Sequence, residues 1–405
     1  MRILMLSATF PYPPTRGGTQ VRTFNLLKFL RQRHRITLMT QRSPDVTDAE
    51  VEELRGWVDE LAIFPRPEAP GGGLGAKVQR WGEFLATGTP PSVKALASPE
   101  IQAWVDRAIA SGEYGALTCE HCVNELYVRP EFRQRLTTLV NIHSSVYGTC
   151  RNQLATGTSE NVWRDRLNLP LLKRYEQRYS QKFSQLVVTT RDDAQQMQVF
   201  APQTPIHVIP NGVDFEQFPW RSADPGGHRV IFVGAMDNLQ NIDAARFFVL
   251  EVLPLLQQRY PAATLQIVGA RPTPEVVALG DRPGVTVTGR VPSMVEYLHQ
   301  ATVCVVPMRT GFGIKNKTLE AMAAGVPVVA SDRGLEGLAV DGDAPLRALR
   351  ANQVSEYLEA IGRLFDQGDL RAEMSRHARA LIETEYTWEE AGRRYEQALL
   401  APPHP

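Results

Sequence analysis

Residues 305–338 read VVPMRTGFGIKNKTLEAMAAGVPVVASDRGLEGL, and this stretch decides how the second half of the chain is interpreted. It begins at the end of an apolar, β-branched run, which indicates a buried strand. A loop rich in glycine and cations follows. The helix-like run TLEAMAAG comes next, and Gly325 is expected to end it in a left-handed conformation. VPVVAS then predicts a second short strand, so the stretch reads as one unit of a parallel α/β sheet.

The loop before this helix holds Arg309, Lys315 and Lys317 together with Gly313. Cationic side chains, backbone N–H groups and the positive end of a helix dipole all favour an anion. We therefore expect a phosphorylated ligand at this loop. The small residues after Leu319 allow helix and strand to pack closely, which leaves Glu320 to face the ligand.

The same stretch resembles the nucleotide-binding signature of the retaining glycosyltransferases of family 4, which have the GT-B fold. GFG, LEAMAAG and VPVVA follow one another here in the family's order. The loop between GFG and LEAM is longer than usual, and the first glutamate of the family's pair is missing. Thr310 stands at its position by motif and Phe312 by spacing from Glu320. In the family this first glutamate contacts the transferred sugar, so the departure concerns sugar recognition.

The resemblance extends over nearly the whole chain. It implies two Rossmann-like, doubly wound α/β domains that face each other across a cleft, with a C-terminal helix that crosses back to the N-terminal domain. We place the acceptor-side domain at residues 1–212, a Pro- and Gly-rich linker at 213–228, the nucleotide-sugar domain at 229–385 and the returning helix at 386–405.

Composition agrees with a two-domain soluble enzyme, since 43% of the 405 residues are hydrophobic and 22% are charged. The net charge is zero, which argues against bulk attraction to nucleic acid. The distribution is uneven, because the first 44 residues hold eight Lys or Arg and no acid, and residues 1–210 hold 25 basic and 20 acidic side chains. This asymmetry suits contact with anionic lipid or a polyanionic acceptor, and a solvated helix face is the alternative.

No apolar run is long enough for a membrane span, and no signal peptide is recognisable, so we expect a cytoplasmic protein, with peripheral contact at the inner face of the membrane as an option. Four cysteines suggest a reducing compartment. Cys119 and Cys122 form the sequence CEHC. A metal site there would need a further ligand, so we favour buried thiols over a metal site.

The chain opens with strands at 2–8 and 35–40 and a helix from 18 to 33 between them. Apolar residues recur at three-residue spacing on one helical face, while Arg22 and Lys28 are expected on the others. Gly17 and Gly18 precede this helix at the carboxyl end of the first strand, where open α/β sheets bind ligands. Contact with diphosphate or acceptor is the functional interpretation, in line with a similarly placed loop of family 4. A proline-rich turn with a glycine cap is the alternative.

Two histidines follow strands predicted at 115–119 and 137–142, which places His121 and His143 near the carboxyl edge of the same sheet. In family 4 a histidine after the corresponding strand contacts the donor sugar near the reaction centre. The run LVNIH fits that position better, so His143 is the predicted catalytic histidine and His121 the second candidate. A structural hydrogen bond is the alternative. Trp81, in a helical patch, is expected to touch membrane, acceptor or the domain itself.

The second half opens with a strand at 229–234 and a helix that Asn241 or Asp243 is expected to cap. Family 4 members place Arg directly after the strand-end glycine and Lys five residues later, and both grip the donor diphosphate. Ala235 and Gln240 occupy these positions here, so that clamp is absent.

We hypothesise that Arg309, Lys315 and Lys317 replace it, with solvated surface cations as the alternative. Cations at this place would stabilise the leaving diphosphate, and Arg309 and Lys315 are therefore predicted catalytic residues. Glu320 would accept both ribose hydroxyls. The other predicted donor-binding positions are Gly17, Gly18, Gly234, Arg290, Val291, Gly313, Lys317, Thr318 and Leu319.

The activity that the resemblance implies is transfer of a sugar from a nucleotide-diphosphate sugar to a glycan, lipid-linked or small-molecule acceptor, with retention of anomeric configuration and without metal or other cofactor. A GT-B epimerase, and a non-catalytic sugar-nucleotide-binding or assembly protein, are the alternatives. A dinucleotide oxidoreductase fits less well, because no G-x-G-x-x-G connects a strand to a helix.

Overall fold

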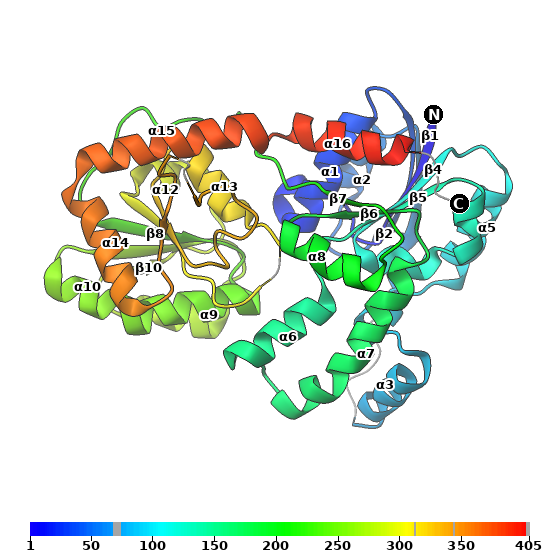
Figure 1. The fold of residues 1–405 in the computed structure, drawn as a ribbon, viewed down its shortest axis with the longest axis horizontal. Helices are drawn as coiled ribbons and strands as arrows, with labels where there is room; N and C mark the ends of the chain where they lie inside the picture. Colours follow the sequence, from blue (N-terminus) through cyan, green and yellow to red (C-terminus); the bar gives the residue numbers. More distant parts are fainter. Residues whose placement is uncertain (68–73, 312, 343–344, 402–405) are drawn as a thin grey trace. The chain divides into compact units, whose positions relative to one another are not determined.

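The computed structural model describes residues 1–67, 74–311, 313–342 and 345–401. The chain forms two compact units: unit 1 comprises Met1–Pro210 with Ala391–Pro405, and unit 2 comprises Asn211–Glu390. Each unit has its own parallel sheet and its own hydrophobic core (Figure 1). Residues 213–228, predicted as a linker, are part of unit 2.

Unit 1 contains a seven-stranded sheet in the order β3-β2-β1-β4-β5-β6-β7, with every neighbouring pair parallel. The strands are β1 (Arg2–Ser7), β2 (Arg35–Arg42), β3 (Glu60–Pro65), β4 (Ala116–Glu120), β5 (Thr137–Asn141), β6 (Gln185–Val188) and β7 (Ile206–Val208). The order reverses between β1 and β4. In doubly wound sheets, ligands bind at the carboxyl ends of the strands on either side of such a reversal.

The helices of unit 1 are α1 (Gly18–Leu30), α2 (Asp48–Arg55), α3 (Leu74–Thr87), α4 (Pro91–Lys94), α5 (Pro99–Ala110), α6 (Val146–Thr156), α7 (Val162–Ser180) and α8 (Arg191–Phe200). Short 3₁₀ turns are η1 (Pro14–Arg16), η2 (Cys122–Tyr127) and η3 (Pro130–Gln134). The last helix, α16 (Trp388–Leu400), starts in unit 2, and from Ala391 onward it belongs to unit 1.

Helix α1 corrects one prediction, because Arg22 is buried and only 1% exposed. The sequence placed Arg22 on a polar face, but α16 packs on α1, so that face is not open to solvent. Gly392 of α16 lies so close to Phe29 that a Cβ atom would come within 2.2 Å of the ring. Glu396 on the next turn accepts hydrogen bonds from Arg33 (2.8 Å) and pairs with His34 (2.8 Å). Helix α1 is therefore enclosed by an element far away in sequence.

Unit 2 contains a six-stranded parallel sheet in the order β10-β9-β8-β11-β12-β13. The strands are β8 (Arg229–Val233), β9 (Thr264–Val268), β10 (Val285–Val287), β11 (Val303–Val306), β12 (Val328–Ala330) and β13 (Leu349–Arg350). The order reverses between β8 and β11, so the ligand-binding edge is expected where these two strands end. Two sheets of this kind confirm the predicted doubly wound α/β class.

The helices of unit 2 are α9 (Leu239–Phe247), α10 (Leu253–Arg259), α11 (Pro274–Ala278), α12 (Met294–Gln300), α13 (Asn316–Ala323), α14 (Val354–Asp366) and α15 (Gly368–Glu385), with a π-helical turn η4 (Phe248–Val252) and a 3₁₀ turn η5 (Leu279–Asp281). Gly325 follows α13 with φ 78°, which confirms the predicted left-handed ending. The predicted cap of α9 is wrong, because Asn238 is the capping residue and its side chain accepts a hydrogen bond from the Gln240 backbone (3.0 Å).

Candidate active site

Three glycines line the carboxyl edge of the unit 2 sheet. Gly234 follows β8, Gly269 follows β9 and Gly289 lies just past β10. Gly269 donates a hydrogen bond to the Gly289 carbonyl (3.2 Å), and a Cβ atom on Gly269 would lie 1.7 Å from the Gly234 carbonyl oxygen. No side chain fits at that contact. The strand ends therefore meet backbone to backbone, which leaves their polar groups close to any ligand at this edge.

Lys317, in the first turn of α13, lies beside the Gly234 end of β8. Its ammonium group donates to the Asn241 side-chain oxygen (2.5 Å) and sits 4.5 Å from the centre of the Phe232 ring. A Cβ atom on Gly234 would come within 2.9 Å of the Lys317 nitrogen. Desolvation lowers the pKa of Lys317 to about 7. A phosphate at the Gly234 backbone would meet this amine and favour its charged form.

Glu320 lies one helical turn after Lys317, on the same face of α13. Its side chain is half-buried, and within the described part of the chain its carboxylate has no hydrogen-bond partner. Desolvation raises the pKa of Glu320 to about 7, and the nearby charge of Lys317 acts against that rise. A half-buried carboxylate without a donor is a group that ligand hydroxyls can satisfy.

The two other cations of this loop are already paired with carboxylates. Arg309 binds both oxygens of Asp243 on α9, at 3.0 Å for the Nε contact, and its guanidinium lies 5.3 Å from the Phe247 ring centre. Lys315 is 8% exposed and bonds to the Gly313 carbonyl and, at 3.4 Å, to Glu336. Among the three cations, Lys317 alone has no carboxylate partner within the described residues, because its ammonium group donates to the Asn241 amide oxygen.

The remaining predicted positions in unit 2 differ in what they expose. Thr318 is buried and donates to the Gly334 carbonyl (2.7 Å), and Leu319 is in the core, so only their backbone N–H groups are at the helix start. Gly313 has φ 74° and offers its carbonyl to Lys315. Arg290 is exposed and Val291 is half-buried against the core. Thr310, at the position of the missing glutamate, is buried, and Phe312 lies outside the described residues.

In unit 1 the structure brings His121 and His143 together at the carboxyl edge. Their ring centres are 5.2 Å apart, edge to face. His121 is a non-glycine residue with φ 82°, a conformation that proteins retain mainly at functional positions. Burial lowers the pKa of His121 to about 4. Burial, followed by the charges of His121 and Arg22, lowers the pKa of His143 well below its ordinary value. Both rings are therefore neutral at physiological pH.

The histidine pair differs in hydrogen bonding. The Nδ1 atom of His121 accepts from the Val123 backbone (3.4 Å) and contacts the Cys122 sulfur (3.7 Å). The Nε2 atom of His143 is buried and lacks a hydrogen-bond partner within the described residues. His143 is thus the ring whose nitrogen is left for a ligand, and His121 packs against it.

Gly17 and Gly18 lie at the start of α1, after the loop that follows β1. Gly17 has an extended backbone, and its carbonyl accepts from Val21 (3.0 Å). The same loop is tied to the chain after β4, because the Ala8 backbone donates to the Asn124 side chain (2.7 Å). The glycine loop and the region around His121 therefore share one edge of the unit 1 sheet.

A buried polar network that the sequence did not indicate lies beneath the histidines. Arg22 donates to Asn141 (2.9 Å), and Asn141 donates to Glu120 (2.8 Å). Tyr395 of α16 and Thr118 also donate to Glu120, at 2.6 and 3.0 Å. Glu120 and Asn141 are the last residues of β4 and β5, so this network fixes the strand ends that carry the histidines. These five side-chain types are common in any sequence, so the network could be recognised only from the contacts that the fold creates.

The two cysteines of the CEHC sequence are free thiols in the structure. Cys119 and Cys122 are both buried, which confirms the predicted thiols, and burial raises the pKa of each. No cluster of three or more His, Cys, Asp or Glu suited to a metal ion occurs among the residues described.

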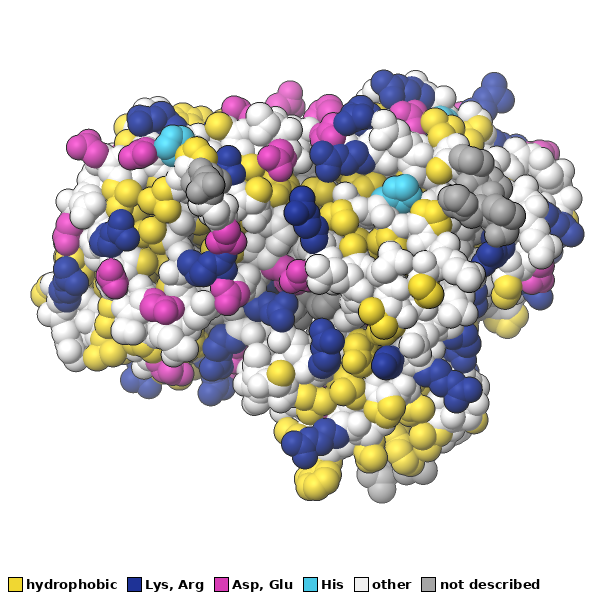
Figure 2. Space-filling model, in the orientation of Figure 1, with side chains coloured by type: hydrophobic (Ala, Val, Ile, Leu, Met, Phe, Trp, Pro, Cys, Tyr) yellow, Lys and Arg dark blue, Asp and Glu magenta, His cyan; other side chains and the backbone are white. Residues whose placement is uncertain are grey.

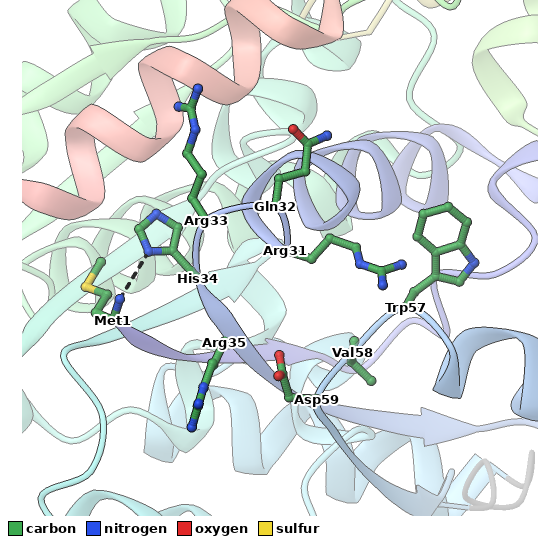
Figure 3. Close-up of a pocket in the computed structure, with 9 residues that line it drawn as sticks. All are labelled: Met1, Arg31, Gln32, Arg33, His34, Arg35, Trp57, Val58 and Asp59. Atoms are coloured by element: carbon green, nitrogen blue, oxygen red, sulfur yellow. Dashed lines mark hydrogen bonds between the residues drawn. The ribbon is translucent and has the colours of Figure 1, made fainter.

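A pocket of about 520 Å³ lies at the opposite, amino edge of the unit 1 sheet, next to the start of β1 and β2 (Figure 3). Arg31, Arg33 and Arg35 line it but point in different directions, and Arg31 lies over the Trp57 ring at 4.8 Å. The arginines do not converge on one point. Because it lies at the amino edge of the sheet, the pocket is separate from the carboxyl edge of unit 1 that carries Gly17 and the two histidines.

In the parts of the chain with described structure, no helix combines the length and the apolarity needed to span a bilayer.

Known protein families match both units. A model of glycosyltransferase family 4 matches residues 16–217, and a model of glycosyl transferases group 1 matches residues 227–367. D-inositol 3-phosphate glycosyltransferase of Acidothermus cellulolyticus is 34% identical over 226 residues, which are 48% of this chain and 48% of that protein. GDP-mannose-dependent monoacylated alpha-(1-6)-phosphatidylinositol monomannoside mannosyltransferase of Corynebacterium glutamicum is 31% identical over 170 residues, 38% of this chain and 43% of that protein. The matches thus span about half of these relatives.

Solved structures share the fold over nearly the full chain. Sucrose-phosphate synthase from Thermosynechococcus elongatus superposes with a TM-score of 0.72 at 18% identity, covering 98% of this chain and 97% of that one. HepE of Anabaena in complex with UDP and glucose gives 0.65 at 15% identity, with 98% and 99% covered. TarM gives 0.68 at 12% identity, with 99% of both covered. The predicted GT-B fold is thereby confirmed.

Proposed function

Because a glycosyltransferase family 4 model matches residues 16–217 and a glycosyl transferases group 1 model matches residues 227–367, we propose that the protein transfers a sugar from a nucleotide-diphosphate sugar to an acceptor hydroxyl. The observation that carries the proposal is the pair on α13, where the Lys317 amine lies beside the backbone of Gly234 and the Glu320 carboxylate has no donor within the described residues. An amine beside a glycine that leaves room at the strand end suits a diphosphate, and a carboxylate suits two ribose hydroxyls.

We propose that Lys317, rather than Arg309 or Lys315, makes the main contact with the diphosphate. Arg309 and Lys315 are held by Asp243 and Glu336, so a ligand would have to compete with a carboxylate for each. Their role is then to shape the loop around the phosphates. This places the replacement for the family's missing clamp on the first turn of α13.

The proposed reaction proceeds with retention of configuration. The acceptor oxygen forms a bond to the anomeric carbon on the face from which the diphosphate leaves, and the bond from that carbon to the diphosphate oxygen breaks. The acceptor proton passes to the departing phosphate oxygen. Negative charge grows on the diphosphate during this step, so a cation at Lys317 and the N–H groups of the α13 start stabilise the transition state more than the substrate.

We propose that His143 contacts the donor sugar or the acceptor as a neutral hydrogen-bonding group. Its Nε2 atom is buried without a partner within the described residues, and its pKa is lowered, so it would position a hydroxyl rather than carry charge. Positioning of a reacting hydroxyl is itself a large catalytic effect.

The donor and acceptor classes are proposed from the relatives. HepE binds UDP-glucose, and the Corynebacterium relative is GDP-mannose-dependent, so uridine and guanosine diphosphate sugars are the first candidates. The two curated relatives are named for inositol phosphate and phosphatidylinositol substrates, which favours a polyol, glycan or lipid-linked acceptor. We further propose that turnover needs no metal, which predicts full activity in the presence of a chelator.

Thermal denaturation with UDP, GDP and ADP tests nucleotide binding. A ligand present at 100 times its dissociation constant stabilises the folded state by about 2.7 kcal/mol, which moves the melting temperature by roughly 2–4 °C or more. Release of the matching nucleotide from UDP-glucose or GDP-mannose, with and without glycan acceptors, then tests catalysis. A shift in melting temperature without nucleotide release would favour the non-catalytic binding protein. The absence of any shift with all three nucleotides would contradict a donor site.

A further inference from the structure

The cations of the first 44 residues do not form the open basic surface that the sequence suggests. Five of the eight cations in the first 44 residues are paired with carboxylates or buried, so they contribute little to an open basic surface. These five are Arg2, Arg16, Arg22, Arg33 and Arg42. Lys28, Arg31 and Arg35 are exposed and have no carboxylate partner within the described residues, and α6 and α7 carry further unpaired surface charge of unit 1.

Helix α7 presents one exposed face with both apolar and cationic side chains. Arg166 and Leu167 lie three and four residues after Trp163, Pro170 lies three residues after Leu167, and Arg174 lies four residues after Pro170; all five are exposed. Trp163 is 77% exposed and Leu167 62%. Residues at this spacing lie on one side of a helix, so the apolar pair and the cations share a face.

Packing within unit 1 does not explain why Trp163 is on the surface. In a helix that packs on a domain, the apolar stripe turns inward, and α7 follows this rule at Tyr175 and Tyr179, which are fully buried, and in part at the half-buried Leu169, Leu171 and Leu172, but not at Trp163 or Leu167. The guanidinium of Arg166 lies 6.0 Å from the Trp163 ring centre. Tryptophan beside arginine is typical of side chains at the boundary between lipid head groups and acyl chains.

The carboxylates of the same segment are turned away from this face. Asp165 is 7% exposed and accepts bonds from Ser159 (2.7 Å) and Arg164 (2.9 Å), and Glu176 is fully buried. Arg166 and Arg174, in contrast, have no carboxylate partner among the described residues. Figure 2 shows hydrophobic side chains with Lys and Arg among them over the region of α6 and α7.

We propose that this face of α7 docks on an anionic membrane surface, with Trp163 and Leu167 entering the head-group region and Arg166 and Arg174 binding lipid phosphates. The cations decide which partner fits this face. Apolar side chains together with unpaired positive charge are complementary to anionic lipid. A second copy of the same face would bring its own arginines close to these, and like charges repel. Trp81 and Leu85 of α3, 45% and 48% exposed, add apolar surface on a neighbouring helix. The docking does not depend on sugar transfer.

Co-sedimentation of the full chain with vesicles tests the proposal. We expect binding to vesicles of phosphatidylcholine mixed with phosphatidylglycerol and weak binding to phosphatidylcholine alone. Trp163→Ala with Leu167→Ala should lower the partition coefficient by roughly tenfold or more, because both side chains lose their buried area in lipid. Val277→Ala with Leu255→Ala removes apolar side chains that are 53% and 42% exposed on unit 2, and this matched control should bind as the parent does.

A charge series completes the test. Arg166→Glu with Arg174→Glu should weaken binding to the anionic vesicles by about fivefold or more per cation at low salt, whereas Arg282→Glu with Arg376→Glu on unit 2 should not. Equal binding by the α7 variants and the parent would overturn the proposal. So would light scattering that shows a dimer abolished by the Trp163 and Leu167 substitutions, since that result assigns the face to a second copy. The melting-temperature shift with UDP or GDP should be the same in all variants, which separates this result from the proposed function.

Discussion

Glu320 and Lys317 lie one turn apart on α13, and burial shifts their pKa values toward each other, to about 7 in both cases. A carboxyl group whose pKa is raised on folding binds its proton more tightly in the folded chain. Its contribution to stability is therefore complete below its unfolded value, near 4.5, and is lost as the pH rises toward 7. Lys317 affects stability at higher pH. Its pKa is lowered on folding, so the unfolded chain binds the proton more tightly, and the free energy of unfolding rises as the pH increases from about 7 toward 10.5.

Glu320→Gln should therefore flatten the pH dependence of stability without nucleotide. Between pH 5 and pH 7, the fall in unfolding free energy with pH should be smaller in the variant by up to about 1.4 kcal/mol per pH unit. Urea denaturation at a series of pH values measures this difference. At pH 7 the variant should be as stable as the parent or more stable, while its affinity for the nucleotide falls. A variant that is less stable at pH 7 would mean that the carboxylate has a structural partner in the folded chain.

The three cations of the 309–317 loop should differ in their effect on donor binding. Lys317→Ala removes the amine beside Gly234, and the loss of a charge-assisted hydrogen bond of about 1.5–3 kcal/mol weakens nucleotide affinity roughly 10- to 150-fold. Arg309→Ala breaks an ion pair with Asp243 in which the arginine side chain is 42% exposed, and exposed pairs contribute about 0–1 kcal/mol. Isothermal titration with UDP or GDP compares the two. Equal losses would mean that Arg309 leaves Asp243 to bind the phosphates.

At the scale of elements, α16 packs closely on α1 at Gly392. Gly392→Ala would place a methyl group 2.2 Å from the Phe29 ring, so that ring or one of the two helices has to move. We expect a loss of about 1–3 kcal/mol in unfolding free energy, the usual cost of overpacking. Gly82→Ala in α3 is the matched control, because no atom lies within 4 Å of the added Cβ and alanine favours a helix. A Gly392 variant as stable as the Gly82 variant would show that α16 adjusts at no cost.

Local signals predicted most of the elements, and contacts between distant segments account for what was missed. The buried strands and Gly325 are visible in short windows of sequence, and the structure has them within one or two residues of the predicted bounds. Arg22 was misjudged because its neighbours on α1 are polar, and the helix that covers it lies more than 350 residues further along the chain. Strand β3 has a polar first residue and half-buried centre, which gave no clear strand pattern.

The same distinction applies to the candidate site. A glycine after a strand and a cation before a helix are local features, so Gly234 and Lys317 could be named from sequence. The roles of Asn241 and Asp243 in the site could not be predicted in this way. Asn241 accepts a hydrogen bond from Lys317 (2.5 Å) and Asp243 pairs with Arg309 (3.0 Å), and both contacts join α9 to a distant segment of the chain. The sequence does not show which of the three cations lacks a carboxylate partner, because this depends on how the loop folds.

At the scale of the whole molecule, unit 1 depends on the end of the chain and unit 2 does not. Removing the residues after Glu390 takes away Tyr395 and Glu396, which leaves Glu120 without one of its donors and Arg33 without its partner. The loss of a hydrogen bond to a buried carboxylate and of the α16 packing should together destabilise unit 1 by several kcal/mol, roughly the sum of a charged hydrogen bond and the burial of two or three side chains. Unit 2 keeps its sheet, its core and all predicted nucleotide-binding residues from Gly234 to Glu320.

Amide hydrogen exchange of the chain ending at Glu390 should therefore show faster exchange in β4 and β5 and unchanged exchange in β8 and β11, and UDP or GDP should still protect the start of α13. Faster exchange in both sheets would instead mean that the two units unfold as one, and that nucleotide binding relies on α16.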